Sequence, residues 1–104
     1  MDLYIVTLEL DDFSEFSSSI CKVEKDLPCA RRAQADAIND FLGRYGLSMT
    51  NKNNIVDFLV YDEDRNEVGE IDIDYDTDTV EISLIDSDFF KTATFKIQYA
   101  SVEM

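Results

Sequence analysis

The hydrophobic pattern of this chain changes its period along the sequence. Residues 3–10 are apolar at both odd and even positions, which is typical of an interior strand covered on both faces. From about residue 13 to residue 45, apolar side chains recur every three or four residues, the period of a helix. From residue 55 onward they mostly alternate with polar side chains, the period of a strand with one buried face. We therefore expect strand, then helix, then strand again.

The first helix is predicted over about residues 13–25. Asp12 has Glu15 three residues further on, as in a capping box, with Asp in place of the usual Ser or Thr. Three consecutive serines, Ser17–Ser19, weaken the prediction, because serine side chains compete for backbone hydrogen bonds. The helix is inferred from four apolar residues at helical spacing: Phe13, Phe16, Ile20 and Val23.

A second helix, over residues 26–46, has a clearer pattern. Asp26 suits the N-cap, Pro28 suits the first turn, and Gly46 suits a left-handed stop. One side of this helix is charged, and its arginines are expected to face solvent or to pair with acids of the same chain. The other side is an apolar stripe formed by Ala30, Ala33, Ala37, Ile38, Phe41, Leu42 and Tyr45.

The second half of the chain predicts four strands after a loop over residues 47–54. The strands span residues 55–61, 67–75, 80–85 and 93–102. The resulting order, β-α-α-β-β-β-β, indicates an α+β fold with an antiparallel sheet of about five strands and two helices packed on one face. With 104 residues, of which 45% are hydrophobic, the whole chain (1–104) suits a single domain with one core.

Negative charge is concentrated in one stretch. Between Asp57 and Asp88 lie thirteen carboxylates and a single cation, Arg65, so these 32 residues carry −12 of the formal net charge of −14. Alternate residues of a strand share a face and lie about 6.6–6.8 Å apart. We therefore expect Ile71, Ile73 and Tyr75 to point into the core, while a row of carboxylates lines the outside: Glu70, Asp72, Asp74, Asp76 and Asp78.

This row of carboxylates destabilises the sheet, because Asp is a poor strand former and like charges on neighbouring strands repel. One interpretation is a solvated face that keeps the protein soluble or blocks edge pairing. Another is that the row imitates the phosphates of a nucleic acid and occupies the basic groove of a nucleic-acid-binding protein. The near-absence of Lys and Arg over this stretch favours the second, since a merely soluble surface intersperses both signs.

Calcium binding is a third interpretation and is disfavoured. Asp62, Asp64 and Asn66 match the first ligand positions of an EF-hand loop, and a second frame begins at Asp72. Both frames lack the required glycine and the final glutamate. We expect no dedicated metal site and no cofactor.

Catalysis is also disfavoured. The chain has no histidine and no Gly-rich phosphate loop, so neither Cys21 nor Cys29 has a histidine to activate it. The two cysteines are expected to be small buried residues in a reducing cytosol, although a bridge between them stays open. We expect a protein without enzymatic activity.

The predicted partner-binding residues are the acids of the row, of the turn before it and of the strand after it: Asp62, Glu63, Asp64, Glu70, Asp72, Asp74, Asp76, Asp78 and Glu81. Asp86 is a further candidate, and Tyr61 or Phe89 is expected to supply an aromatic anchor. In size and charge the chain resembles the small acidic proteins that phages and mobile elements use against host nucleic-acid enzymes. These include anti-restriction and anti-CRISPR proteins, many of which are DNA mimics. The resemblance is one of composition over the whole chain.

We therefore expect a cytoplasmic inhibitor that binds a basic nucleic-acid-binding protein or complex by protein–protein interaction. It should bind neither nucleic acid nor a membrane directly, because both repel a negative face. Residues 1–10 have no basic start, and no stretch has the roughly 18–20 apolar residues of a membrane span. Two alternatives stay open: an immunity protein or antitoxin against a basic toxin, and an accessory structural protein with a solubilising face. An exposed sheet edge would also allow a homodimer.

Overall fold

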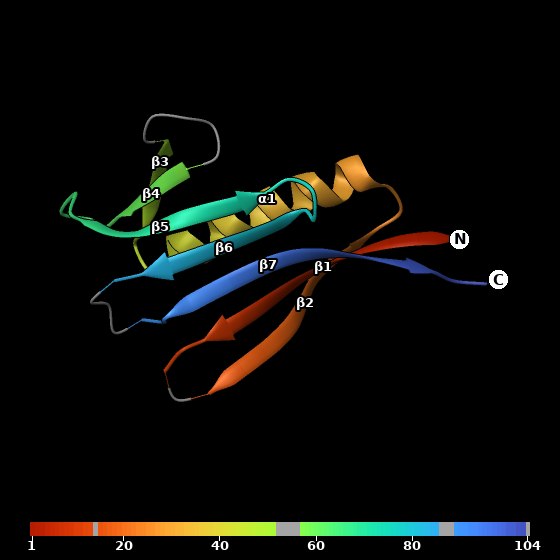
Figure 1. The fold of residues 1–104 in the computed structure, drawn as a ribbon, viewed down its shortest axis with the longest axis horizontal. Coiled ribbons are helices and arrows are strands. Elements are labelled where there is room, and N and C mark those ends of the chain that lie inside the picture. Colours follow the sequence, from red (N-terminus) through yellow and green to blue (C-terminus); the bar gives the residue numbers. More distant parts are fainter. Residues whose placement is uncertain (14, 52–56, 86–88, 104) are drawn as a thin grey trace.

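The computed structural model describes residues 1–13, 15–51, 57–85 and 89–103, with the side chains of 50, 51, 57 and 58 left out (Figure 1). Within these residues it contains one helix, α1 (Leu27–Arg44), and seven strands. The strands are β1 (Asp2–Asp11), β2 (Phe16–Glu24), β3 (Ser48–Asn51), β4 (Asp57–Tyr61), β5 (Glu67–Asp74), β6 (Thr79–Leu84) and β7 (Thr92–Ser101).

The strands form a single antiparallel sheet in the order β2-β1-β7-β6-β5-β4-β3. The edge strands β2 and β3 do not pair with each other, so the sheet is an open half-barrel. Figure 1 shows α1 lying across one face, behind β5 and β6 in that view. We call this the inner face and the opposite one the outer face.

The core lies between the inner face and α1. Direct cross-strand partners share a face, so the register places Val80 opposite Phe95 on the inner side, where both are buried. The ring of Phe41 on α1 lies 5.0 Å from that of Phe90 and 5.6 Å from that of Phe95. The buried residues of the core cluster are Ile38, Phe41, Leu42, Leu47, Val60, Ile71, Val80, Ile82, Leu84, Phe90, Ala93 and Phe95.

One buried amide fastens α1 to the sheet. Gln34 is 7% exposed, and its Nε2 donates to the carbonyl oxygens of Asp78 at 2.8 Å and Phe95 at 3.0 Å. A buried carbonyl without a donor is costly. Gln34 thus holds the β5–β6 turn and β7 against the helix.

The prediction of a helix over residues 26–46 is confirmed. Asp26 is the N-cap, and its Oδ1 accepts from the backbone N–H of Cys29 at 2.8 Å. Pro28 lies in the first turn, and Gly46 has φ 67°, the left-handed conformation that ends the helix. Local signals sufficed here because capping acts within one turn.

The prediction of a helix over residues 13–25 is wrong, because this segment contains β2. β2 pairs with β1, but the register shifts between Lys22 and Ile20, which leaves Cys21 as an extra residue. Such a bulge changes which residues face outward. The bulge therefore brings Val23 to the outer face that already carries Phe16 and Ile20. The resulting spacings of four and three residues imitate those of a helix.

The predicted fold of about five strands and two helices is therefore corrected to seven strands and one helix. The segment expected to be a loop, residues 47–54, contains β3. β1 is an interior strand as expected, and β5, β6 and β7 match their predicted positions within one or two residues. β4 begins at Asp57, and the first two residues predicted for it, 55 and 56, lie outside the described residues.

Candidate partner-binding surface

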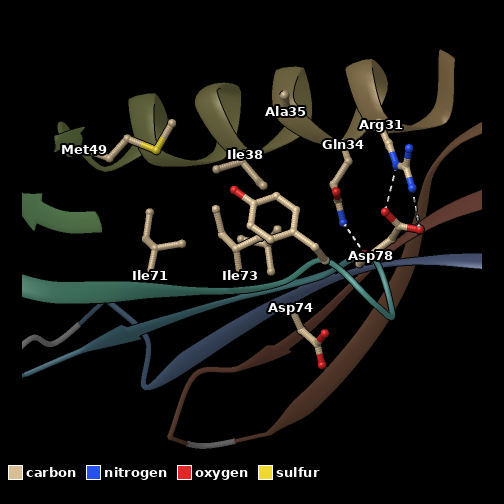
Figure 2. Close-up of a pocket in the computed structure, with 11 residues that line it drawn as sticks. Arg31, Gln34, Ala35, Ile38, Met49, Ile71, Ile73, Asp74 and Asp78 are labelled. Carbon is tan, nitrogen blue, oxygen red and sulfur yellow. Dashed lines mark hydrogen bonds and ion pairs between the residues drawn. The ribbon is translucent and has the colours of Figure 1, made fainter. Parts of the chain in front are cut away.

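Four of the predicted carboxylates lie together on the outer face. Glu70, Asp72 and Asp74 alternate along β5 and are exposed, whereas Ile71 between them is 2% exposed in the core. Glu81 on β6 is the direct cross-strand partner of Asp72. Figure 2 shows the Asp74 carboxylate on the side of the sheet away from α1. We call these four residues the acidic face.

The acidic face is not neutralised by an ion pair within the described part of the chain. The two ion pairs there join Arg31 to Asp78 and Lys96 to Glu9. In directly opposed pairs such as Asp72 and Glu81, the Cβ atoms lie about 4.5–5.5 Å apart. β5 is hydrogen-bonded on both sides, to β4 and β6. The like charges are therefore held close together on a stiff support.

The row ends where the β5–β6 turn begins, over residues 75–78. Asp76 is exposed in this turn, and its backbone N–H donates to Asp74 Oδ1 at 3.0 Å. Tyr75 lies on the α1 side of the sheet, where it lines a cleft beside α1, but it is 57% exposed, so the expectation that it belongs to the core is wrong. Strand alternation does not extend into a turn, and this limits the row to three residues of β5.

Asp78 is paired inside the molecule. Arg31 Nε on α1 donates to Asp78 Oδ1 at 2.8 Å, and Arg31 Nη2 lies 3.5 Å from Oδ2 (Figure 2). This hydrogen bond raises the pKa of Arg31. The backbone of Asp78 is also left-handed, with φ 51°, and its carbonyl accepts from Gln34. Asp78 therefore lies against α1 and is separate from the acidic face.

The other three predicted acids belong to the β4–β5 turn, at the opposite end of β5. Asp62 Oδ1 accepts from the backbone N–H groups of Asn66 and Asp64, both at 2.9 Å. The hydrogen bond from Asn66 is the main reason that the pKa of Asp62 is lowered. Glu63 and Asp64 are both exposed, and the Glu63 side chain lies near Gly46, just after α1. Asp86 lies outside the described residues.

A cleft opens between α1 and the β5–β6 hairpin (Figure 2). Its volume is about 230 Å³, and the Arg31–Asp78 ion pair lies at its border. Its walls are mostly aliphatic, with Ala35, Ile38, Met49, Ile71, Ile73 and Val80 among the lining residues. The aliphatic part of this lining can hold an apolar group, and the polar lining residues are Arg31, Gln34, Asp74, Tyr75 and Asp78.

The two expected aromatic anchors lie in different places. The ring of Phe89 packs 5.1 Å from that of Tyr45, just after α1, on the α1 side of the molecule. Tyr61 is half-buried at the end of β4, two residues from Leu59, the direct partner of Glu70, so strand alternation places it on the outer face beside the acidic face. Sequence reasoning missed a different apolar surface, because it assigned the residues to a helix. On the outer side of β2, Phe16 is 67% and Ile20 66% exposed.

The cysteines were expected to be buried, and this is wrong: Cys21 and Cys29 are both exposed free thiols. Partial desolvation raises the pKa of Cys21, and the hydrogen bond to Asp26 raises the pKa of Cys29. Raised pKa values make thiols poor nucleophiles at neutral pH. Among the described residues, no cluster of Cys, Asp and Glu is arranged to hold a metal ion.

In the same described ranges, no helix has the length and apolar character needed to cross a membrane. The chain matches no family model, and no curated protein or solved structure is similar enough to indicate a family.

Proposed function

We propose that this protein is a non-catalytic inhibitor whose acidic face occupies the basic groove of a nucleic-acid-binding protein. The observation that carries the proposal is the group of Glu70, Asp72, Asp74 and Glu81, exposed together on adjacent strands without a neutralising cation among the described residues. Placing like charges directly opposite one another destabilises a sheet. A cationic partner offsets that cost when it binds.

The geometry suits a groove built for phosphates. From Glu70 to Asp74 the row is about 13 Å long, at roughly 3.3–3.4 Å per residue. Exposed Asp64 and Asp76, in the turns at the two ends of β5, extend the negative surface along the same direction. A groove that binds nucleic acid presents Lys and Arg to successive phosphates. Short Asp side chains on hydrogen-bonded strands present anions with little loss of side-chain entropy.

Electrostatic attraction of this kind acts mainly on association. A groove lined by one sign of charge steers an oppositely charged partner and raises the on-rate, and salt screens this effect. The proposed complex therefore forms quickly at low ionic strength and weakens as salt rises. Nucleic acid competes for the same groove.

The test compares two charge-reversed variants of equal net charge. Asp72→Lys/Asp74→Lys removes half of the acidic face. Asp36→Lys/Asp40→Lys changes two exposed acids of α1 by the same amount. Each tagged protein is used to capture proteins from a bacterial lysate at about 50 mM and about 500 mM salt, with and without duplex DNA.

We expect the wild type and the α1 variant to retain a basic partner at low salt and to lose it to added DNA. The β5 variant should retain none. Equal capture by the β5 variant would show that the acidic face does not recognise the partner. A partner that the acidic face binds but DNA cannot displace would indicate a toxin-neutralising protein instead.

A further inference from the structure

The first half of β2 is an unprotected sheet edge. Among the strands that the structure describes, β2 pairs only with β1, so its other side carries unpaired backbone N–H and C=O groups. Natural edge strands are usually protected by charged residues or proline. The segment Phe16–Ile20 has neither, and all five of its residues are exposed.

The register gives this segment a symmetric pattern. Phe16, Ser18 and Ile20 share the outer face, because their direct partners on β1 are Asp11, Glu9 and Thr7. Ser17 and Ser19, opposite Leu10 and Leu8, are on the inner face. The bulge at Cys21 ends the regular alternation after Ile20. The five residues therefore read apolar, serine, serine, serine, apolar, with Ser18 at the centre.

We propose that two copies of this chain form a dimer through antiparallel pairing of their Phe16–Ile20 segments, with a two-fold axis at Ser18. In this register Phe16 of each copy lies across from Ile20 of the other. The two resulting pairs both lie on the outer face. Aromatic residues paired with β-branched ones stabilise antiparallel strands. An interface that pairs one patch with itself closes as a dimer.

The distribution of charge allows a second copy of the chain to pair with β2, although each chain carries a net charge of −14. No residue of Phe16–Ile20 is charged, and Glu9, directly across from Ser18, is paired with Lys96 at 3.2 Å. β5, which carries most of the acidic face, is four strands from β2, or about 19 Å at 4.8 Å per strand. In the dimer the two β5 strands are nine strand spacings apart, about 43 Å along the curved sheet, whereas the screening length is about 8 Å at physiological salt. Repulsion between the acidic faces therefore opposes the pairing only weakly.

Sedimentation equilibrium between about 5 and 300 µM tests the proposal, a range suited to an interface of modest area. The wild-type mass should rise from the 11.9 kDa of a single chain towards twice that value. Ile20→Lys should raise the dissociation constant at least tenfold, because an ammonium group then faces Phe16. Val23→Lys is the matched control: Val23 is an exposed residue of β2 on the same face but beyond the bulge, and its substitution should change the constant less than twofold. Both variants lower the net negative charge, so weaker association of Ile20→Lys cannot come from added repulsion.

Crosslinking tests the register in a background with Cys21→Ser and Cys29→Ser. Ser18→Cys should form a covalent dimer on oxidation, because the two Ser18 residues face each other across the axis. Ser17→Cys should form far less, since Ser17 faces Ser19. A wild type that stays monomeric to 300 µM, a mass that grows beyond the dimer, or equal crosslinking of the two cysteine variants would overturn the proposal. No other protein takes part, so these results do not depend on the proposed inhibitor function.

Discussion

Neutralising Asp72 is expected to stabilise the folded protein while weakening its binding. Asp72 lies at the centre of the acidic face, between Glu70 and Asp74 along β5 and opposite Glu81 on β6. Asp72→Asn removes one charge and keeps the shape of the side chain. Any gain in stability then reports the repulsion that the acidic face imposes on the fold.

The size of this repulsion follows from the geometry. The Cβ atoms of Asp72 and Glu81 are about 5 Å apart, and Glu70 and Asp74 each lie about 6.7 Å from Asp72 along β5. We take these distances as the separations of the charges. In water, three such repulsions add to about 2 kcal/mol before screening. Screening at physiological salt reduces the total to about 1 kcal/mol, and 1 M salt to about 0.3 kcal/mol. A gain of about 1 kcal/mol corresponds to a rise in Tm of roughly 4–8 °C for a domain of this size.

The assay is thermal and urea unfolding of the wild type and Asp72→Asn at about 0.15 M and about 1 M NaCl. We expect the variant to be more stable at low salt and nearly equal to the wild type at high salt. Asp36→Asn is the control, because Asp36 on α1 lies between Arg32 and Asp40 at helical spacing, and their effects oppose each other. A variant that is less stable than the wild type, or a gain that does not depend on salt, would refute the electrostatic reasoning.

Three further predictions concern the fold. Gly69→Ala should destabilise the fold by about 1–3 kcal/mol in urea unfolding, because the added Cβ would collide with the backbone oxygen of Ser83 and push β5 away from β6. Gly43→Ala has open space around the added Cβ and should stabilise the fold by about 0.5–1 kcal/mol. Equal effects of the two substitutions would contradict this packing. Gln34→Leu should cost about 1–3 kcal/mol, since two carbonyls lose their donor, and an unchanged urea midpoint would show that α1 does not need this link. Asp26→Ala tests how the stability of the fold depends on pH through the helix cap. The hydrogen bond from the backbone N–H of Cys29 lowers the folded pKa of Asp26 below its ordinary 3.8. The stabilisation by Asp26 is therefore full above about pH 3.8 and is lost as pH falls through the folded pKa. The difference in unfolding free energy between wild type and variant should shrink in acid. A difference that stays constant with pH would argue against this cap.

The sequence alone determined the elements whose signals are local. The limits of α1 could be predicted because Asp26, Pro28 and Gly46 act within one turn of the helix. The strands β5, β6 and β7 could be predicted from alternation, which also identified the outward row on β5. Each of these features depends only on residues a few positions apart.

Tertiary structure decided the features that depend on distant partners. β2 forms because β1 offers it hydrogen bonds, and the bulge at Cys21 gives its outer face the spacing of a helix. Asp78 is in the turn after the acidic row, and there it pairs with Arg31, which is 47 residues away in the sequence. Periodicity records which side chains share a face of a local element, but it does not record which distant strand or cation that face meets.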